Sequence, residues 1–325
     1  MVEMSYRQAM TKALREALLK DHSLYLFGED IGGYGGSYAV TKGFLEEFGP
    51  ERIIDTPISE SAMVGVGIGA AMAGLRPVVE IMTINFALLA MDQIVNHAAK
   101  LRYMSGGQYT VPIIIRTVTG AGAQLGATHS QSLEGWFASV PGLKVVVPSD
   151  PKDALGLFRA VMSEQDPVIF VEHLLLYSSK GEVPEDDYVV PIGKAEVKRN
   201  GDEITIISYS RMVLVALEAA QELAEMDISV EVVDLRSLSP LDIETVLESV
   251  RKTGHALVVE EACRTGGFGA EVASQVQEFA FDHLDGPVLR VAGEDVPIPY
   301  SQPLEKLAIP TADSIIAAVK NMLGR

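Results

Sequence analysis

Short apolar runs alternate with longer segments of helical periodicity along the first half of the chain. The runs predict buried strands, and the segments in which apolar residues recur every third or fourth position predict helices. The predicted strands span residues 24–27, 52–54, 76–81, 111–116, 144–147 and 168–172. The predicted helices span residues 5–20 (with Ser5 as N-cap), 42–48, 59–73, 86–104 and 151–162. This alternation predicts an α/β fold with a mostly parallel sheet covered on both faces.

A polar, acidic segment that contains Pro184 interrupts the pattern at residues 181–187. Such segments commonly join domains, so we predict a linker that extends to about Ile192. The alternation then resumes, with strands predicted at 203–208, 229–234, 256–260 and 288–291 and helices at 212–226, 240–250, 269–281 and 312–323. We therefore predict two doubly wound domains, residues 1–185 and a smaller domain of residues 186–325.

The composition narrows the classes of partner. The chain has 325 residues and a formal net charge of −18, which disfavours nucleic acid and anionic membrane surfaces as partners. A basic protein partner would suit this charge. The single cysteine, Cys263, excludes a disulfide framework and favours a reducing compartment. The sequence has no signal pattern at its start and no apolar run long enough to span a membrane, so we expect a cytoplasmic protein.

Several common motifs are missing. Gly65, Gly67 and Gly69 suggest a dinucleotide-binding loop, but Met72 stands where the third glycine of that motif belongs. The sequence has no phosphate-binding loop of the ATPase type, no Gly-x-Ser-x-Gly elbow and no paired histidines at metal-binding spacing. These absences disfavour nicotinamide enzymes, ATPases, hydrolases of that type and metalloproteases.

Glu60 stands at the start of the predicted helix 59–73, with no cationic residue within four positions on either side. One interpretation is structural, because the helix macrodipole favours an acid at this end. The other is functional. Apolar neighbours such as Ile58, Ala62 and Met63 would raise the pKa of the carboxyl group, which could then share a proton with a ring nitrogen of a ligand.

Small residues form two strips along the same predicted helix. Gly65, Gly69 and Ala73 recur every four positions, as do Gly67 and Ala71. Each interior glycine costs about 0.5–1 kcal/mol of helix stability relative to alanine, so several together indicate a close contact. The contact could be internal packing, a partner helix or a ligand.

His129 lies in the small polar segment 126–132, within a long loop that is predicted from residue 117 to 134. Long loops in compact α/β domains are commonly functional, so His129 is a candidate catalytic residue. His97 falls in a predicted helix and His255 at the start of a predicted strand, which favours structural roles for both. A structural role for His129 also remains open.

Motifs distributed over the whole chain resemble the beta subunits of thiamine-diphosphate-dependent 2-oxoacid dehydrogenases, and most of all those of pyruvate dehydrogenases. In the first half they are Gly28-Glu29-Asp30, Asp55-Thr56-Pro57-Ile58-Ser59-Glu60, Gly74-Leu75-Arg76-Pro77-Val78, Asp92-Gln93-Ile94, Arg102-Tyr103-Met104-Ser105-Gly106-Gly107, His129-Ser130-Gln131 and Pro141-Gly142-Leu143-Lys144-Val145-Val146. In the second half they are Val233-Asp234-Leu235-Arg236 and Glu260-Glu261-Ala262-Cys263-Arg264-Thr265-Gly266-Gly267. The series is specific, although each member alone would be weak.

The resemblance implies a pyrimidine-binding domain of the transketolase type followed by a transketolase C-terminal domain. It implies that Glu60 binds the aminopyrimidine ring of thiamine diphosphate and stabilises its imino tautomer. Phe86 resembles the aromatic residue that stacks on this ring, and Ile58 and Met82 resemble residues that line its pocket. Glu29 resembles an acid close to the cofactor.

In this family the alpha subunit holds the diphosphate and magnesium through a Gly-Asp-Gly motif. The chain has no such motif, because Gly201-Asp202 is followed by Glu203. The resemblance therefore implies that the chain carries half of an active site. His129 resembles the histidine near the reacting carbon, which donates a proton or assists acetyl transfer to a lipoyl arm.

The resemblance also implies a structural potassium site built largely from main-chain oxygens. Ile113 fits one of its positions. Val161, Glu164 and Asp166 occupy the others, where relatives more often have alanine, aspartate and asparagine. Leu89 stands where some relatives have a glutamine close to the cofactor.

The implied activity is oxidative decarboxylation of pyruvate with transfer of the acetyl group to the lipoyl arm of a dihydrolipoyl acyltransferase core. This is an oxidoreductase reaction on an oxo group with a disulfide as acceptor. The implied assembly is a heterotetramer of two alpha and two beta chains. The alternatives are a beta subunit that acts on branched-chain 2-oxoacids or acetoin, and an assembly subunit with no catalytic role.

Overall fold

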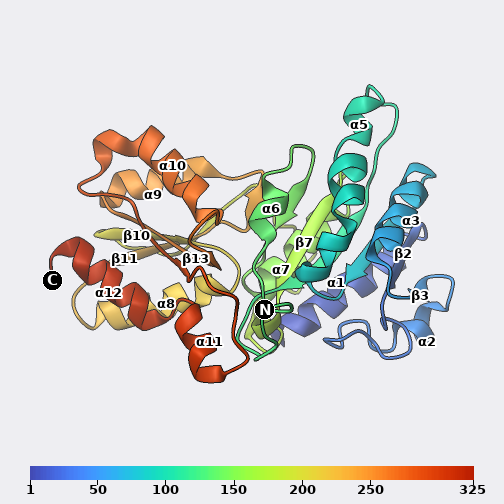
Figure 1. The fold of residues 1–325 in the computed structure, drawn as a ribbon, viewed down its shortest axis with the longest axis horizontal. Coiled ribbons are helices and arrows are strands. Elements are labelled where there is room, and N and C mark those ends of the chain that lie inside the picture. Colours follow the sequence, from blue (N-terminus) through green and yellow to red (C-terminus); the bar gives the residue numbers. More distant parts are fainter. The chain divides into compact units, whose positions relative to one another are not determined.

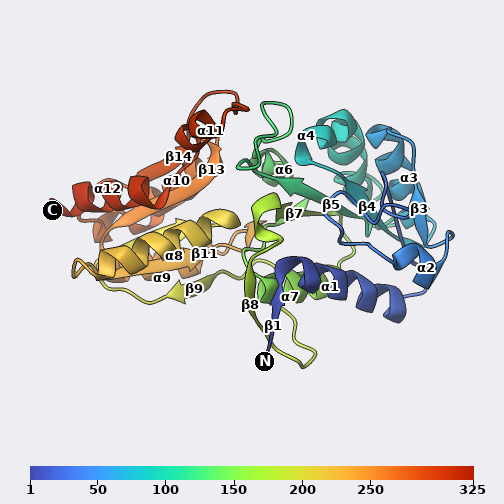
Figure 2. The ribbon, with the colours of Figure 1, turned by 90° about the horizontal axis from the view of Figure 1, so that it is seen from below.

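The computed structural model describes residues 1–325, which divide into two compact units (Figures 1 and 2). The first unit comprises Met1–Thr119 and Trp136–Ile192, and the second comprises Gly120–Gly135 and Gly193–Arg325. The loop predicted at residues 117–134 thus belongs mainly to the second unit. The predicted α/β class with two doubly wound domains is confirmed, as the two sheets below show.

Six parallel strands form the sheet of the first unit, in the order β6-β7-β5-β4-β2-β3. Figure 2 shows α1 and α7 on one face of this sheet and α3 and α4 on the other. The strands are β2 (Leu24–Gly28), β3 (Ile53–Asp55), β4 (Arg76–Ile81), β5 (Ile114–Thr119), β6 (Lys144–Val146) and β7 (Val168–His173). The principal helices are α1 (Tyr6–Lys20), α2 (Phe44–Phe48), α3 (Glu60–Met72), α4 (Ile84–Ala87), α5 (Leu101–Met104) and α7 (Pro151–Val161). The short helix α6 spans Glu134–Ala138.

The start of α1 confirms the predicted N-cap. The Ser5 hydroxyl accepts a hydrogen bond from the Gln8 backbone N–H, and the Gln8 side chain accepts one from the Ser5 N–H. This reciprocal pair satisfies two backbone donors that the helix itself cannot pair.

The prediction of one continuous helix at residues 86–104 is wrong. The segment is divided into α4, a 3₁₀ turn (Leu88–Ala90), a π-helical turn (Gln93–Ala98) and α5. The Ala99 N–H donates to the Ile94 carbonyl, five residues back, which widens the helix at this point. Apolar periodicity cannot reveal such a change of winding, because both helix types keep one face toward the sheet.

The segment predicted as a linker is partly ordered in a strand. β8 (Lys180–Val183) pairs antiparallel with β1 (Val2–Ser5), from Val2 opposite Val183 to Ser5 opposite Lys180. Neither strand was predicted, because each is four residues long and pairs with a strand about 180 residues away in the sequence.

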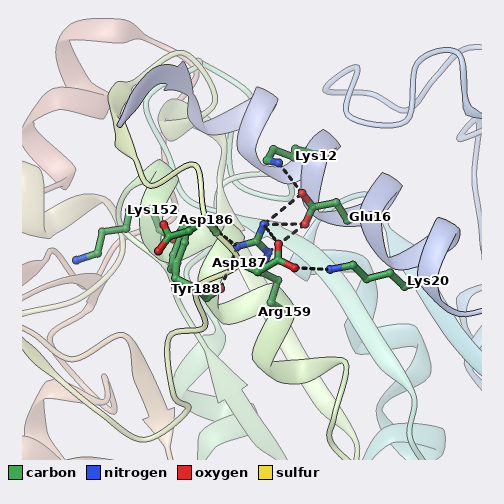
Figure 3. Close-up of polar contacts among 8 residues, drawn as sticks. All are labelled: Lys12, Glu16, Lys20, Lys152, Arg159, Asp186, Asp187 and Tyr188. Atoms are coloured by element: carbon green, nitrogen blue, oxygen red, sulfur yellow. Dashed lines mark hydrogen bonds and ion pairs between the residues drawn. The ribbon is translucent and has the colours of Figure 1, made fainter.

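Arg159 of α7 binds the segment that follows β8 (Figure 3). Its guanidinium donates to both carboxylate oxygens of Glu16 at 2.9 and 3.2 Å, and to the carbonyl oxygens of Tyr188 and Asp186 at 3.0 and 3.3 Å. A Cβ at Gly156 would lie 2.5 Å from a methyl carbon of Val190, so the glycine lets this segment approach α7. Arg159 therefore joins α1, α7 and the end of the first unit.

The second unit has a five-stranded sheet in the order β14-β13-β10-β11-β9, parallel except for β9. Its core contains apolar residues of the central strands and of α8 and α12. The strands of this sheet are β9 (Glu196–Arg199), β10 (Ile204–Ser208), β11 (Val230–Asp234), β13 (Ala256–Cys263) and β14 (Leu289–Gly293), and the short strand β12 (Ser237–Ser239) lies outside it. The helices are α8 (Arg211–Ala224), α9 (Ile243–Thr253), α10 (Gly269–Ala280), α11 (Gln302–Ala308) and α12 (Ala312–Leu323). None of the helices in the chain combines the length and apolarity needed to cross a bilayer.

Replacing Arg159 by methionine is expected to lower the free energy of unfolding by about 1–3 kcal/mol at neutral pH, because several charge-assisted hydrogen bonds are lost. Burial alone would raise the pKa of Glu16, but hydrogen bonds from Lys12 and Arg159 outweigh it and lower that pKa. The stabilisation is thus present above the ordinary Glu value of 4.5 and is lost as the pH falls through the lowered pKa.

Urea denaturation followed by the fluorescence of Trp136, the single tryptophan, measures this change. The control is Lys20→Met, which removes only the exposed pair between Lys20 and Asp187 and should change stability by less than about 0.5 kcal/mol. Equal effects of the two substitutions would contradict the importance of Arg159.

Candidate functional site

The carboxyl ends of three neighbouring strands bring the candidate residues of the first unit to one edge of the sheet. Gly28 at the end of β2 lies opposite both Asp55 of β3 and Glu80 of β4. Glu29 follows β2 directly, and Met82 follows β4. Ligands of open parallel sheets bind outside this edge.

Glu60 is the first residue of α3, and its side chain is only 4% exposed. The macrodipole of α3 favours a negative charge at this position. No side chain of the chain donates a hydrogen bond to its carboxylate or forms an ion pair with it. The residue is largely covered, but its carboxylate oxygens are not fully enclosed, so the macrodipole explains its position and no protein group donates to it.

Glu29 lies within the electrostatic range of Glu60. Partial burial raises the pKa of the Glu29 carboxyl, and the negative charges of Glu60 and Asp30 raise it further. The structure thus brings together two acids that are 31 positions apart in the sequence. The raised pKa of Glu29 makes it the more readily protonated acid at this edge of the sheet.

Asp55 holds the glycine-rich loop beside these acids, a role that the sequence analysis missed. Its carboxylate accepts hydrogen bonds from the backbone N–H groups of Gly32 and Gly33 at 2.6 and 3.0 Å. A Cβ at Gly32 would lie 2.9 Å from the same carboxylate. The position of Asp55 at the end of a predicted strand could have marked it as a site residue. Its partners could not be identified in the same way, because they lie 22 and 23 residues away in the sequence.

The residues predicted to contact a pyrimidine ring follow β4 or precede α3. Met82 and Phe86 are half-buried, and Phe86 belongs to α4. The Thr83 hydroxyl caps α4 by accepting from the Asn85 N–H at 3.2 Å. Ile58 is 81% exposed, in the segment before α3. The structure therefore places Met82 and Phe86 in partly covered positions and leaves Ile58 open.

His129 belongs to the second unit and is exposed. Its Nδ1 lies 3.0 Å from the Thr128 hydroxyl oxygen, and its backbone N–H donates to the Gly126 carbonyl at 3.2 Å. The turn at Gly126 has a φ of +76°, which favours glycine. His129 is thus held on a defined turn with its side chain exposed, and its catalytic role stays a prediction.

The acidic side chains of the predicted potassium site are already paired with cations. Glu164 pairs with Lys144, and Asp166 accepts from Arg102 at 2.7 Å. The structure contains no cluster of three or more His, Cys, Asp or Glu residues that could hold a metal ion. Any ion here would therefore depend on main-chain oxygens.

Those main-chain oxygens have protein donors of their own. The carbonyl of buried Ile113 accepts from Val168 N–H at 3.0 Å, and that of Val161 accepts from Glu164 N–H at 3.1 Å. The Glu164 carbonyl accepts from the Arg76 guanidinium at 3.0 Å. Each carbonyl has a second lone pair, so the potassium site stays a prediction.

The residues of the chain fit one end of thiamine diphosphate but not the other. Unpartnered Glu60 with Glu29 beside it suits a protonatable ring. The Gly201-Asp202 pair, in contrast, serves the fold, since its N–H groups donate to the Glu231 carboxylate at 3.2 Å and the Ser229 hydroxyl at 3.0 Å. Glu60 and Glu29 are therefore the side chains of this chain that suit the pyrimidine end of the cofactor, and this assignment stays a prediction.

Glu60→Gln is expected to lower the pKa of Glu29 toward its ordinary value, because the repulsion between the two carboxylates is removed. NMR titration of protein labelled with carboxyl-¹³C glutamate measures this pKa, and the Glu29→Gln variant assigns the signal. The matched control is Glu46→Gln, an exposed acid on α2, which should leave the titration of Glu29 unchanged. An unchanged Glu29 pKa in Glu60→Gln would show that the two acids do not face each other.

Two family models match the chain, one in each half. The model of the transketolase pyrimidine-binding domain matches residues 2–179, and that of the transketolase C-terminal domain matches residues 193–315. The boundary expected between residues 185 and 186 falls between these matches and stays a prediction. A solved structure of a split gene transketolase, described as an inactive beta4 tetramer, has a TM-score of 0.81 and 27% identity, and the likeness covers 99% of this chain and 98% of that one.

Curated relatives cover nearly the whole chain. The pyruvate dehydrogenase E1 component subunit beta of Rhizobium meliloti (strain 1021) is 47% identical over 321 residues, which are 98% of this chain and 70% of that protein. The mitochondrial subunit beta-2 of Oryza sativa subsp. japonica is 48% identical, over 99% of this chain and 87% of that protein. The subunit beta of Rickettsia bellii (strain RML369-C) is 46% identical, over 99% of both. The chain therefore belongs to the family of pyruvate dehydrogenase E1 beta subunits, built from a transketolase pyrimidine-binding domain and a transketolase C-terminal domain.

Proposed function

We propose that the chain is the beta subunit of the decarboxylating component of pyruvate dehydrogenase, which oxidatively decarboxylates pyruvate and passes the acetyl group to a lipoyl arm. The observation that carries this proposal is the buried, unpartnered carboxylate of Glu60 at the edge of the first sheet, in a chain about half identical to named E1 beta subunits. The single cysteine, exposed and free, agrees with a cytoplasmic location.

Thiamine diphosphate, when bound, supplies the reactive carbon and accepts the electrons left by departing carbon dioxide. Glu60 would hold a proton at a ring nitrogen of the aminopyrimidine, and Glu29 would keep that proton in place by repelling a second negative charge. Phe86 would cover the ring face, with Met82 and Ile58 against its edge. The residues of this chain thus bind, orient and protonate the ring.

The alpha subunit would hold the diphosphate and magnesium, for which this chain has no residues. The proposed assembly contains two alpha and two beta chains. Its support is the exposed side of α3, where Gly69 faces open space and Val66 is exposed. Three further apolar side chains are exposed nearby. Leu89 lies in the 3₁₀ turn that contacts α3, and Tyr103 and Met104 lie in α5, which follows the π-helical turn. These exposed apolar side chains support the proposed interface with a second chain.

Two further contacts belong to the same proposal. The net charge of −18 suits a basic binding domain of the lipoyl-bearing dihydrolipoyl acyltransferase core. A potassium ion would bind main-chain oxygens of Ile113, Val161, Glu164 and Asp166 and stabilise the end of α7. Removal of potassium would then lower thermal stability without changing the substrate preference.

Glu60→Gln is expected to lower decarboxylation by at least about 100-fold while the alpha and beta chains still associate, because the amide cannot share a proton with the ring. The measurement is co-expression with the alpha chain, followed by a panel of pyruvate, branched-chain 2-oxoacids and acetoin with an artificial electron acceptor. Glu51→Gln, at an exposed position, is the control. Full activity of Glu60→Gln would favour an assembly subunit, and a preference for another substrate would replace pyruvate.

His129→Ala is expected to impair the overall reaction through the lipoyl arm by about 10²–10⁴-fold, the range for loss of a proton-transferring group. Size-exclusion chromatography should show that the assembly is retained. The control is His22→Ala, at an exposed position of the first unit. Normal turnover of His129→Ala in the reconstituted complex would remove this residue from the proposed mechanism.

A further inference from the structure

The segment that leads to His129 has an unusual backbone. Gly120, Gly122, Gln124 and Gly126 all have positive φ, at +103°, +105°, +59° and +76°. Gln124 is the only one that carries a side chain, and a side chain makes this conformation unfavourable. A backbone of this shape turns neighbouring N–H groups toward a common side, where they can bind an anion.

Two carboxylates of the second unit occupy that side. Glu261 of β13 accepts a hydrogen bond from the Ala121 N–H at 2.6 Å. Glu305 of α11 accepts from the N–H groups of Gly122 at 2.8 Å and Gln124 at 3.1 Å. The three donors of the segment are therefore all held by charged acceptors from distant parts of the same unit.

Glu305 depends on these bonds as much as the segment does. Its side chain is 2% exposed, and no cation pairs with it. Glu261, in contrast, also has Arg211 at 3.4 Å. Because a covered charge without donors is disfavoured, moving the segment away from Glu305 would remove every hydrogen bond that its carboxylate accepts in the chain. The segment and α11 thus hold each other in one arrangement.

Contacts continue from this point to His129. A Cβ at Gly126 would lie 2.3 Å from the Tyr300 ring, so the segment passes directly against a residue five positions before Glu305. The Gly126 carbonyl then accepts from the His129 N–H, and Thr128 contacts the His129 ring. The orientation of His129 is therefore set by the turn that Glu305, Glu261 and Tyr300 enclose.

We propose that Glu305, with Glu261, is a positioning residue for His129: its buried carboxylate fixes the backbone of residues 121–126 and so directs the histidine toward the reacting group. This inference rests on the proposed role of His129 in the reaction through the lipoyl arm. Glu305 touches only backbone N–H groups of its own unit, so it acts through the histidine and has no contact with the substrate.

The first experiment measures the backbone directly. Hydrogen exchange of peptides that cover residues 120–130, in the assembled alpha–beta component, should be at least about 10-fold faster in Glu305→Gln, because the amide has no charge and presents its own donors to the N–H groups. Glu305→Asp, which keeps the charge on a shorter side chain, should restore part of the protection. Glu278→Gln, an exposed acid on α10, is the control and should change nothing. Unchanged exchange in Glu305→Gln would overturn the proposal.

The second experiment measures turnover through the lipoyl arm in a double-mutant cycle. Glu305→Gln should lower kcat about 10- to 100-fold in the wild type, the cost of a misplaced catalytic group, and by less than about twofold in the His129→Ala background. Equal losses in both backgrounds would show that Glu305 acts through general stability and would overturn the positioning role. If His129→Ala alone has full activity, the proposed role of His129 fails, and hydrogen exchange still decides whether Glu305 holds the segment.

Discussion

The buried guanidinium of Arg116 is the interaction on which the first sheet depends. It lies on β5 between Glu80 on β4 and Glu172 on β7, and it donates to both carboxylates and to the Tyr177 hydroxyl. Burial alone would lower the pKa of Arg116, but the charges of Glu172 and Glu80 outweigh it and raise that pKa well above its usual value. Removing one partner of such a group costs about 3–5 kcal/mol. The network therefore joins three neighbouring strands, and its two glutamates stand next to the last residues of β4 and β7.

Three buried glutamates of this protein differ in the groups that surround their carboxylates. Glu172 has the guanidinium of Arg116 beside it. Glu305 has only backbone N–H groups, which makes it a support for the turn that leads to His129. Glu60 has no hydrogen-bonding or cationic partner in its own chain, and Glu29 beside it adds repulsion instead of compensation. Glu60 is therefore the one of the three whose carboxylate lacks a donor in its own chain, whereas Glu172 and Glu305 have theirs.

Much of the fold could be predicted from the sequence because it rests on local signals. Apolar runs located every strand of the parallel sheet in the first unit, and Ser5 located the start of α1. The glycine strips of α3 could not be assigned in advance, since both have the same spacing. A Cβ at Gly67 would lie 2.8 Å from an Ile113 methyl carbon, so that strip packs on the sheet, while Gly69 faces open space. The strip with Gly67 thus serves internal packing, and the strip with Gly69 lies on an open surface. Periodicity alone cannot tell the two strips apart.

The site was predictable where a residue stands beside its own signal, and unpredictable where its partner is remote. Glu60 could be identified because it begins a helix of small residues without a cation nearby. Glu261 and Glu305 have no such local signal, because the backbone groups that they bind lie 140 and 183 residues away in sequence. The segment that they hold begins at Gly120, directly after the last residue of β5, and it belongs to the second unit. Residues 121–124 are held by carboxylates of their own unit that stand far along the chain, which is why local sequence patterns do not reveal their course.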